Sequence, residues 1–264
     1  MTKRFERTDR KGIRLTARDL QIVEAVFEAR YLTNQMIARL LFAPTTFSTC
    51  KQRLRYLYDL GYLAKRQAHV NEPDVYYLGL RGKRHIVSKG EYTKEAVDRI
   101  AGVSGGSAAA PILMMEHELT LSRLYVNARL ECAAHGWRLR WRNARMLELA
   151  RLGMQPDAWL RVEGEQRSLQ AYIEFTGVLP TAAELQAKIA RYQAHWEGLE
   201  APIPVLWLTT SRSKVQLLRK GIGDSGYRDY FLLGLIEDAS RFLTGKVWWW
   251  SESEEMIQWI RPPR

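Results

Sequence analysis

Residues 46–66 read TFSTCKQRLRYLYDLGYLAKR, and this stretch decides the fold expected for the first part of the chain. Cys50, Leu54 and Leu57 recur at the spacing that places them on one side of a helix. Gly61 follows where helices commonly end, because glycine takes the left-handed conformation of that position without strain. The stretch therefore predicts a helix over residues 45–59 that leads directly into a strand.

Two further helices precede this one, and a second strand follows it. Thr16 begins an amphipathic helix at about 17–30, and Thr33 begins a shorter one at 34–42, because threonine side chains cap the first turn of a helix. Two strand-like runs between residues 62 and 80 are joined by the turn sequence NEPD. Three helices followed by a hairpin are the element order of a winged helix-turn-helix domain, which places one helix in the major groove of DNA.

The third helix and the hairpin carry the side chains expected to contact DNA. Polar and basic residues of these types hydrogen-bond to base edges or pair with phosphates. They are Thr46, Ser48, Thr49, Lys51, Gln52 and Arg55 on the helix, and Lys65, Arg66 and His69 on the hairpin. The sequence leaves an alternative open, since a domain with this element order can also serve in protein–protein contact alone.

Charge and tryptophan content divide the chain in two. The formal net charge is +11, and residues 1–100 hold 20 Lys and Arg against 11 Asp and Glu, a net charge of +9. All nine tryptophans lie at or after Trp137. The small-residue stretch AGVSGGSAAAP between the two compositions is typical of a flexible linker. We therefore expect a DNA-binding domain at 12–100, a linker at 101–112, and a mixed α/β domain at 113–264 with an aromatic C-terminal segment.

Composition also excludes several classes of protein. Two cysteines, Cys50 and Cys132, cannot form a disulfide framework or a four-cysteine zinc site. The first residues lack the apolar segment of a secretory signal, and no apolar run is long enough to span a membrane. The expected protein is therefore cytoplasmic, with double-stranded DNA rather than a membrane as its partner.

Two carboxylates in the second half indicate a metal site. Asp157 follows a proline at the start of a predicted strand, and Glu174 lies 17 residues later in the next strand. A helix, a strand, a Pro-Asp strand, a Glu-containing strand and a helix form the element order of the PD-(D/E)xK nucleases, in which such carboxylates hold Mg²⁺ to polarise a phosphate and activate water. The candidate catalytic residues are Asp157, Glu174 and Lys188, and the candidate metal ligands are Asp157, Glu174 and Glu118. No cofactor is expected otherwise.

The lysine of this motif is missing from the strand. The expected Glu-x-Lys reads Glu174-Phe175-Thr176, so Lys188 on the following helix would have to supply the positive charge. The two acids can equally be surface or salt-bridge residues of a hairpin. We therefore expect a degenerate nuclease-like fold in which DNA binding is favoured over catalysis, and the sequence leaves open the alternative of metal-dependent cleavage or nicking of DNA.

Eight segments between residues 15 and 192 resemble, in their order, the replication-relaxation family of plasmids and integrative elements. They are LTARD, ARYLTNQMIARLLF, RLRYLYDLGYLAKR, YYLGLRG, HELTLSRLYV, QPDAWL, YIEFT and KIARY. The resemblance implies a DNA-binding accessory or regulatory protein of a mobile element, linked to replication, DNA relaxation or conjugative transfer, with a relaxase or a replication protein as partner. The family strand more typically reads Glu-x-Asp, and Thr176 departs from it.

The C-terminal segment holds Trp248, Trp249, Trp250 and Trp259. These rings could pack as a final strand, form a homodimer interface, or stack on unpaired bases beside the arginines around Trp141. A homodimer would match the two-fold DNA sites that helix-turn-helix proteins often bind.

Overall fold

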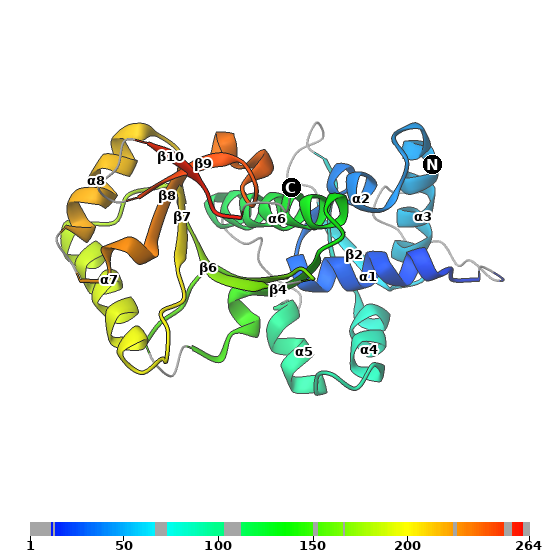
Figure 1. The fold of residues 1–264 in the computed structure, drawn as a ribbon. Helices are drawn as coiled ribbons and strands as arrows, with labels where there is room; N and C mark the ends of the chain where they lie inside the picture. The colour runs from blue at the N-terminus through cyan, green and yellow to red at the C-terminus, as the bar shows by residue number, and fades with distance from the viewer. Residues whose placement is uncertain are drawn as a thin grey trace. The chain divides into compact units, whose positions relative to one another are not determined.

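The computed structural model describes residues 12, 14–66, 73–102, 112–149, 153–165, 167–223, 226–250 and 255–260, and Figure 1 draws its ribbon. The chain divides into two compact units, Met1–Val126 and Asn127–Arg264, and each unit contains its own sheet. The predicted class, a mixed α+β protein, is confirmed. Residues 103–111 of the predicted linker lie outside the described residues.

The first unit is mostly helical and contains a small antiparallel sheet with the strand order β1-β3-β2. The predicted helices before the hairpin are present as α1, α2 and α3, and the two predicted strands are present as β2 and β3. The elements are α1 (Ala17–Ala29), β1 (Leu32–Thr33), α2 (Asn34–Leu41), η1 (Pro44–Thr46), α3 (Phe47–Asp59), β2 (Leu63–Arg66), β3 (Val75–Leu78), α4 (Leu80–Ser88), α5 (Lys94–Ala101) and the start of α6 (Ile112–Ala134).

Polar contacts fix the beginning of α1 and join it to α3. The Asp19 N–H donates to Thr16 Oγ1, and the Thr16 N–H donates to Asp19 Oδ2, so two N–H groups of the first turn are satisfied reciprocally. Asp19 also accepts a hydrogen bond from Arg53 of α3, with 2.9 Å between Nε and Oδ1. The Asp19 side chain is fully buried. This ion pair therefore holds α3 against α1.

The apolar sides of the first three helices form the core of the first unit. Ile22, Ile37, Leu54 and Leu57 are fully buried there. Gly61 has a φ of 77°, which lets the chain leave α3 and enter β2 at once, as the sequence predicts. Because α3 buries one side only, its polar side lies toward solvent.

The second unit contains a seven-stranded sheet with the order β10-β9-β8-β7-β6-β5-β4. The pairs β6–β7 and β7–β8 are parallel, and the other neighbouring pairs are antiparallel. Its elements after α6 are β4 (Arg138–Asn143), η2 (Ala144–Met146), β5 (Ala158–Glu163), β6 (Ser168–Thr176), α7 (Ala182–Glu197), β7 (Val205–Thr209), α8 (Arg212–Ile222), η4 (Arg228–Tyr230), β8 (Phe231–Leu235), η5 (Ile236–Arg241), β9 (Lys246–Trp250) and β10 (Met256–Gln258).

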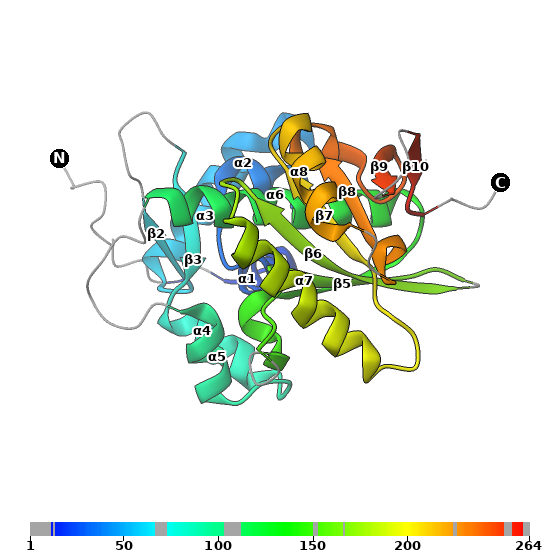
Figure 2. The ribbon, with the colours of Figure 1, turned by 90° about the vertical axis from the view of Figure 1, so that its left-hand side faces the viewer.

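Helices α7 and α8 lie on the same side of this sheet in both views (Figures 1 and 2). They arise from the parallel pairs, because a parallel connection must cross back over the sheet, most often as a helix. The core beneath them is rich in aromatic rings, including Tyr192, Trp196, Trp207 and Phe231. On the other side the end of α6 is tied to a turn, where Glu131 accepts hydrogen bonds from the N–H groups of Leu243 and Thr244.

Two of the four tryptophans in the C-terminal segment are packed in a strand of the sheet, which is one of the three roles expected from the sequence. Trp248 is fully buried and Trp249 is 7% exposed, both in β9. The Trp248 indole donates a hydrogen bond to the Phe242 carbonyl at 2.7 Å. Trp250 and Trp259 are half-buried. The buried rings therefore extend the sheet core.

Candidate functional site

The polar side of α3 is the first candidate site. Ser48, Thr49, Lys51 and Gln52 are exposed there, and Thr46 and Arg55 are half-buried. Cys50, Leu54 and Leu57 on the other side are fully buried. Five of the six residues predicted for DNA contact thus lie on the sides of α3 that do not enter the core, and Thr46, the last residue of η1, directly precedes the helix.

Several of these side chains are held in place by neighbours on the same helix. Gln52 donates to the Tyr56 hydroxyl at 2.7 Å, and Arg55 Nε lies 3.0 Å from Asp59 Oδ1. Lys51 Nζ lies 4.7 Å from the centre of the Phe47 ring. Such contacts restrict the rotamers of long side chains, so less conformational entropy is lost when they bind a partner.

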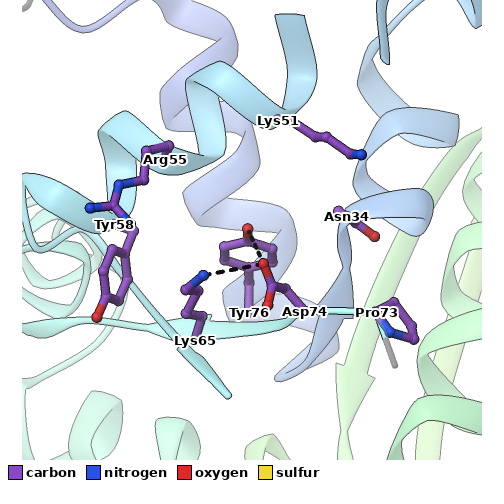
Figure 3. A pocket seen from close by; sticks show the side chains of 8 residues that line it. All are labelled: Asn34, Lys51, Arg55, Tyr58, Lys65, Pro73, Asp74 and Tyr76. Atoms are coloured by element: carbon purple, nitrogen blue, oxygen red, sulfur yellow. Dashed lines mark hydrogen bonds and ion pairs between the residues drawn. The ribbon is translucent and has the colours of Figure 1, made fainter. Parts of the chain in front are cut away.

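A cavity of about 300 Å³ lies between α3 and the β2–β3 hairpin. Figure 3 shows Lys65 and Tyr76 both directed at Asp74, at 3.2 Å and 3.5 Å from its Oδ2. Lys51 and Arg55 of α3 also line this cavity. The side chain of Lys65 is only 7% exposed. The hairpin lysine predicted to contact DNA is therefore engaged in an ion pair, and a phosphate would have to compete with Asp74 for it.

The structure says less about Arg66 and His69, the other two hairpin residues predicted to contact DNA. Arg66 is half-buried at the end of β2. His69 lies outside the described residues. The DNA-contact role of the hairpin stays a prediction.

The second candidate site brings Asp157, Glu174 and Lys188 together in the second unit. Asp157 directly precedes β5, and its Oδ2 accepts a hydrogen bond from the Phe175 N–H at 2.8 Å, which places it beside Glu174 of β6. Lys188 of α7 lies 2.5 Å from Glu174 Oε2. Tyr192, one turn further along α7, donates to Glu174 Oε1 at 2.6 Å. Lys188 thus occupies, from the helix, a position next to both acids.

Burial dominates the electrostatics of this cluster, which we call the acid–lysine cluster (Asp157, Glu174, Lys188 and Tyr192). Glu174 is fully buried, and its desolvation raises its pKa to about 7, although Lys188 opposes the shift. The charge of Asp157 adds to the rise. Burial lowers the pKa of Lys188, but the carboxylates of Glu174 and Asp157 raise it by more, so the net pKa is above its ordinary value.

Of the three predicted metal ligands, Asp157 lies beside Glu174 as described above, and the other two are engaged by other side chains. Glu174 has both carboxylate oxygens occupied, by Lys188 and Tyr192, so a cation would have to displace at least one of them. Glu118 lies on α6 in the first unit and forms an ion pair with Arg30 there. Within the part of the chain that the structure describes, no group of three or more His, Cys, Asp and Glu side chains is arranged to hold a metal ion.

Thr176, which stands where the nuclease motif has lysine, has a structural role. Its hydroxyl accepts a hydrogen bond from the Trp207 indole at 2.8 Å, and its carbonyl accepts one from the Thr209 hydroxyl at 3.0 Å. Lys188 Nζ in turn lies 5.4 Å from the centre of the Trp207 ring. These contacts join β6 and β7 beneath the acid–lysine cluster.

Two contributors to these sites are not among the residues predicted from the sequence. Tyr192 follows Lys188 by four residues, and helical spacing alone indicates that both face the same strand. Asp74 stands in the turn sequence NEPD, and nothing in its sequence context indicates that it pairs with Lys65. Pairing between Lys65 and Asp74 depends on the register of the hairpin.

Comparisons with known proteins agree with the sequence on the family. The model of the replication-relaxation family matches residues 24–206, which is more than half of the chain. The chain belongs to the replication-relaxation family. No curated protein matches it significantly. Among solved structures, restriction endonuclease FokI is 13% identical with a TM-score of 0.30, over 88% of this chain and 45% of the FokI chain. That likeness is too slight to define a shared fold.

Within the described residues, no helix is both long and apolar enough to cross a membrane.

Proposed function

We propose that this protein binds double-stranded DNA as an accessory or regulatory factor of a mobile genetic element, in its replication, relaxation or conjugative transfer. Membership of the replication-relaxation family supports this role. The observation that carries the proposal is the polar side of α3, exposed beside the β2–β3 hairpin in the strongly basic part of the chain. In this proposal the first unit is a winged helix-turn-helix domain.

The chemistry of α3 fits recognition in the major groove. The groove of B-DNA admits a helix, and glutamine and arginine can pair with adenine and guanine through two hydrogen bonds each. Gln52 and Arg55 hold these roles in the proposal. Ser48, Thr49 and Lys51 contact phosphates or neighbouring bases. Lys65, Arg66 and His69 contact the backbone from the hairpin and contribute affinity without sequence preference.

Duplex binding by fluorescence anisotropy over a range of salt concentrations tests this function. Gln52→Ala and Arg55→Ala should each relax preference at single base pairs by about 1–3 kcal/mol. Arg66→Ala should weaken all duplexes alike and reduce the salt slope by about 0.9. The matched control is Lys94→Ala, an exposed residue of α5, which should change neither quantity.

Two outcomes contradict the proposal in different ways. Absence of duplex binding at about 100 mM salt, where phosphate neutralisation still operates, would favour a module for protein–protein contact. Sequence preference that survives both α3 substitutions would show that another element reads the bases.

A metal-dependent DNA endonuclease or nickase is the second candidate function. The convergence of Asp157, Glu174 and Lys188 favours it, because a lysine beside two carboxylates is the group that stabilises charge in phosphate cleavage. Supercoiled plasmid incubated with Mg²⁺ or Mn²⁺ tests this function. Nicking that Asp157→Asn and Glu174→Gln abolish would support it, and nicking that both variants retain would exclude this cluster as its source.

The remaining expectations concern assembly and location. We propose that the protein is cytoplasmic, that it works with a relaxase or a replication protein, and that it forms a homodimer on two-fold DNA sites. Light scattering of the free protein and of its DNA complex measures the dimer directly. A complex with one chain per duplex would contradict it.

A further inference from the structure

One face of β4 and β5 carries four arginines, which we call the arginine face (Arg138, Arg140, Arg142 and Arg161). The first three alternate along β4, so they point to the same side of the sheet. The strand register places Arg140 directly opposite Arg161 of β5. The side chains of these two residues are 54% and 44% exposed, and Arg138 and Arg142 are also exposed. The face is therefore open to a partner.

The arginine face has a positive charge that its own neighbours do not cancel. Glu163, which pairs with Arg138 in the register, accepts contacts from both Arg140 and Arg161, at 3.1 Å and 3.3 Å from their Nε atoms. One carboxylate is thus shared by two guanidinium groups. Like charges directly opposite each other destabilise a sheet. Keeping Arg140 opposite Arg161 costs stability, which an anionic partner would offset.

An aromatic ring stands at one end of the arginine face. Trp159 of β5 is half-buried, and the guanidinium of Arg142 lies 5.7 Å from the centre of its ring. The register pairs Trp159 with Arg142 on one side and with Tyr172 on the other. A tryptophan beside an arginine is the arrangement on which an unpaired base stacks.

The arginine face leads to the acid–lysine cluster on the same side of the sheet. Asp157 precedes Trp159 by two residues and Glu174 follows Tyr172 by two, so all four belong to one side. Two residues of a strand span about 6.6 Å. Figure 2 shows the β5–β6 hairpin extending past the ends of α7 and α8, which leaves its outer part uncovered by these helices.

We propose that the arginine face binds single-stranded DNA, with phosphates on Arg138, Arg140 and Arg161 and a base stacked at Trp159, and directs the strand toward the acid–lysine cluster. Charge complementarity selects a phosphodiester chain. The Trp159–Arg142 pair selects a strand whose bases are unpaired, because a base inside a duplex cannot reach the ring. The proposal does not depend on duplex binding by α3.

A purely structural role for these arginines makes a different prediction. Strand β4 is at the edge of the seven-stranded sheet, and charged residues on an edge strand prevent pairing with other chains. If edge protection is their whole role, replacing them leaves DNA binding unchanged and promotes aggregation.

The test compares two triple variants of the full chain, binding a labelled oligothymidine over a range of salt concentrations. Arg140→Ala/Arg142→Ala/Arg161→Ala should weaken binding about tenfold or more and reduce the salt slope by about 1.4, since Arg140 and Arg161 contact phosphates in the proposal and each lost phosphate contact removes about 0.7. The control, Arg212→Ala/Lys220→Ala/Lys246→Ala, removes three exposed cations of the same unit and should retain the slope. Trp159→Phe should weaken binding and reduce the fluorescence quenching that accompanies it.

Two further measurements distinguish single-strand binding from the alternatives. Replacing the same three arginines with lysine preserves the charge, so this variant should retain the slope while losing affinity from the Trp159–Arg142 pair. Duplex DNA should compete poorly with oligothymidine in a protein that carries Gln52→Ala and Arg55→Ala. Unchanged single-strand binding by the alanine variant, an equal loss in the control variant, or equal competition by duplex would each overturn the proposal.

Discussion

Glu174 is a fully buried carboxylate with a lysine on one oxygen and a tyrosine hydroxyl on the other. Removing a charge from water is costly, and the partners offset only part of that cost, so the pKa rises to about 7. The same group is therefore a candidate for function and a source of pH-dependent stability. Those two roles can be separated by experiment.

Replacing Glu174 with glutamine should remove part of the pH dependence of the free energy of unfolding. The pKa of Glu174 is higher in the folded state than the ordinary 4.5, so its contribution is fully present below pH 4.5 and is lost as pH rises through about 7. The raised pKa contributes up to about 3 kcal/mol to the free energy of unfolding, because each unit of difference between the folded and unfolded pKa corresponds to about 1.36 kcal/mol. Urea unfolding of Glu174→Gln between pH 4.5 and 8 should show a flatter profile than the parent protein. An unchanged profile would place the titration elsewhere.

The buried ion pair between Asp19 and Arg53 makes a prediction about stability alone. Arg53→Met would leave the Asp19 carboxylate buried without its cation, and breaking such a pair typically costs about 3–5 kcal/mol. Denaturant unfolding measures the loss. Arg81→Met, an exposed residue of α4, is the control and should stay within about 0.5 kcal/mol of the parent.

Sequence spacing predicts which acids lie near each other, but not how they are engaged. Asp157, Glu174 and Lys188 follow from the order of strands and helix, and the structure brings them together. Glu118 could not be placed in this way, because its partner Arg30 lies 88 residues away along the chain. Contacts over such separations depend on packing that no local pattern encodes.

Among the elements, the β2–β3 hairpin contains an acid that would compete with the DNA of the proposed function for Lys65. Asp74 holds Lys65, and its own negative charge faces the cavity beside α3. Asp74→Asn should release Lys65 for a phosphate, strengthen binding to all duplexes, and increase the salt slope by about 0.9. Anisotropy titrations at several salt concentrations measure both effects. Asp74→Asn with Lys65→Ala should remove the gain; a gain that persists in this double variant would assign the effect to Asp74 alone.

Strand β8 requires a glycine where it faces the aromatic strand β9. A Cβ atom at Gly234 would lie 2.9 Å from the Trp248 ring and 3.1 Å from the Val247 carbonyl oxygen. Gly234→Ala should therefore destabilise the protein by about 1–3 kcal/mol through overpacking. Gly226→Ala, where a Cβ meets nothing within 4 Å, is the matched control. Equal melting temperatures for the two variants would contradict the packing argument.

Element prediction succeeds where the periodic pattern is long and capped. Thr16 and Thr33 cap helices that begin where the sequence indicates. Strand β1 is two residues long, too short to display any alternation. Strand β8 reads FLLGL and is buried throughout, so it also lacks alternation and is not among the predicted strands.

For the molecule as a whole, the positions of the charged residues say more about nucleic-acid binding than the net charge does. Most of the net charge of +11 belongs to the first hundred residues, yet the second unit contains the arginine face on β4 and β5. A near-neutral segment can still present a positive surface, because the four arginines share a face on which Glu163 contacts only Arg140 and Arg161. The net charge of +2 over residues 101–264 therefore does not argue against nucleic-acid binding there.

The strand order of the large sheet has a consequence for how the protein is made. Every strand from β5 to β10 pairs with the strand that immediately precedes it in the chain. A growing chain can therefore add each strand to the free edge as it leaves the ribosome, without waiting for a distant partner. Short sequence separations between pairing strands favour rapid folding. At each stage, however, the newest strand exposes an unpaired edge, so slow synthesis between β6 and β8 would leave a hydrophobic edge available for aggregation.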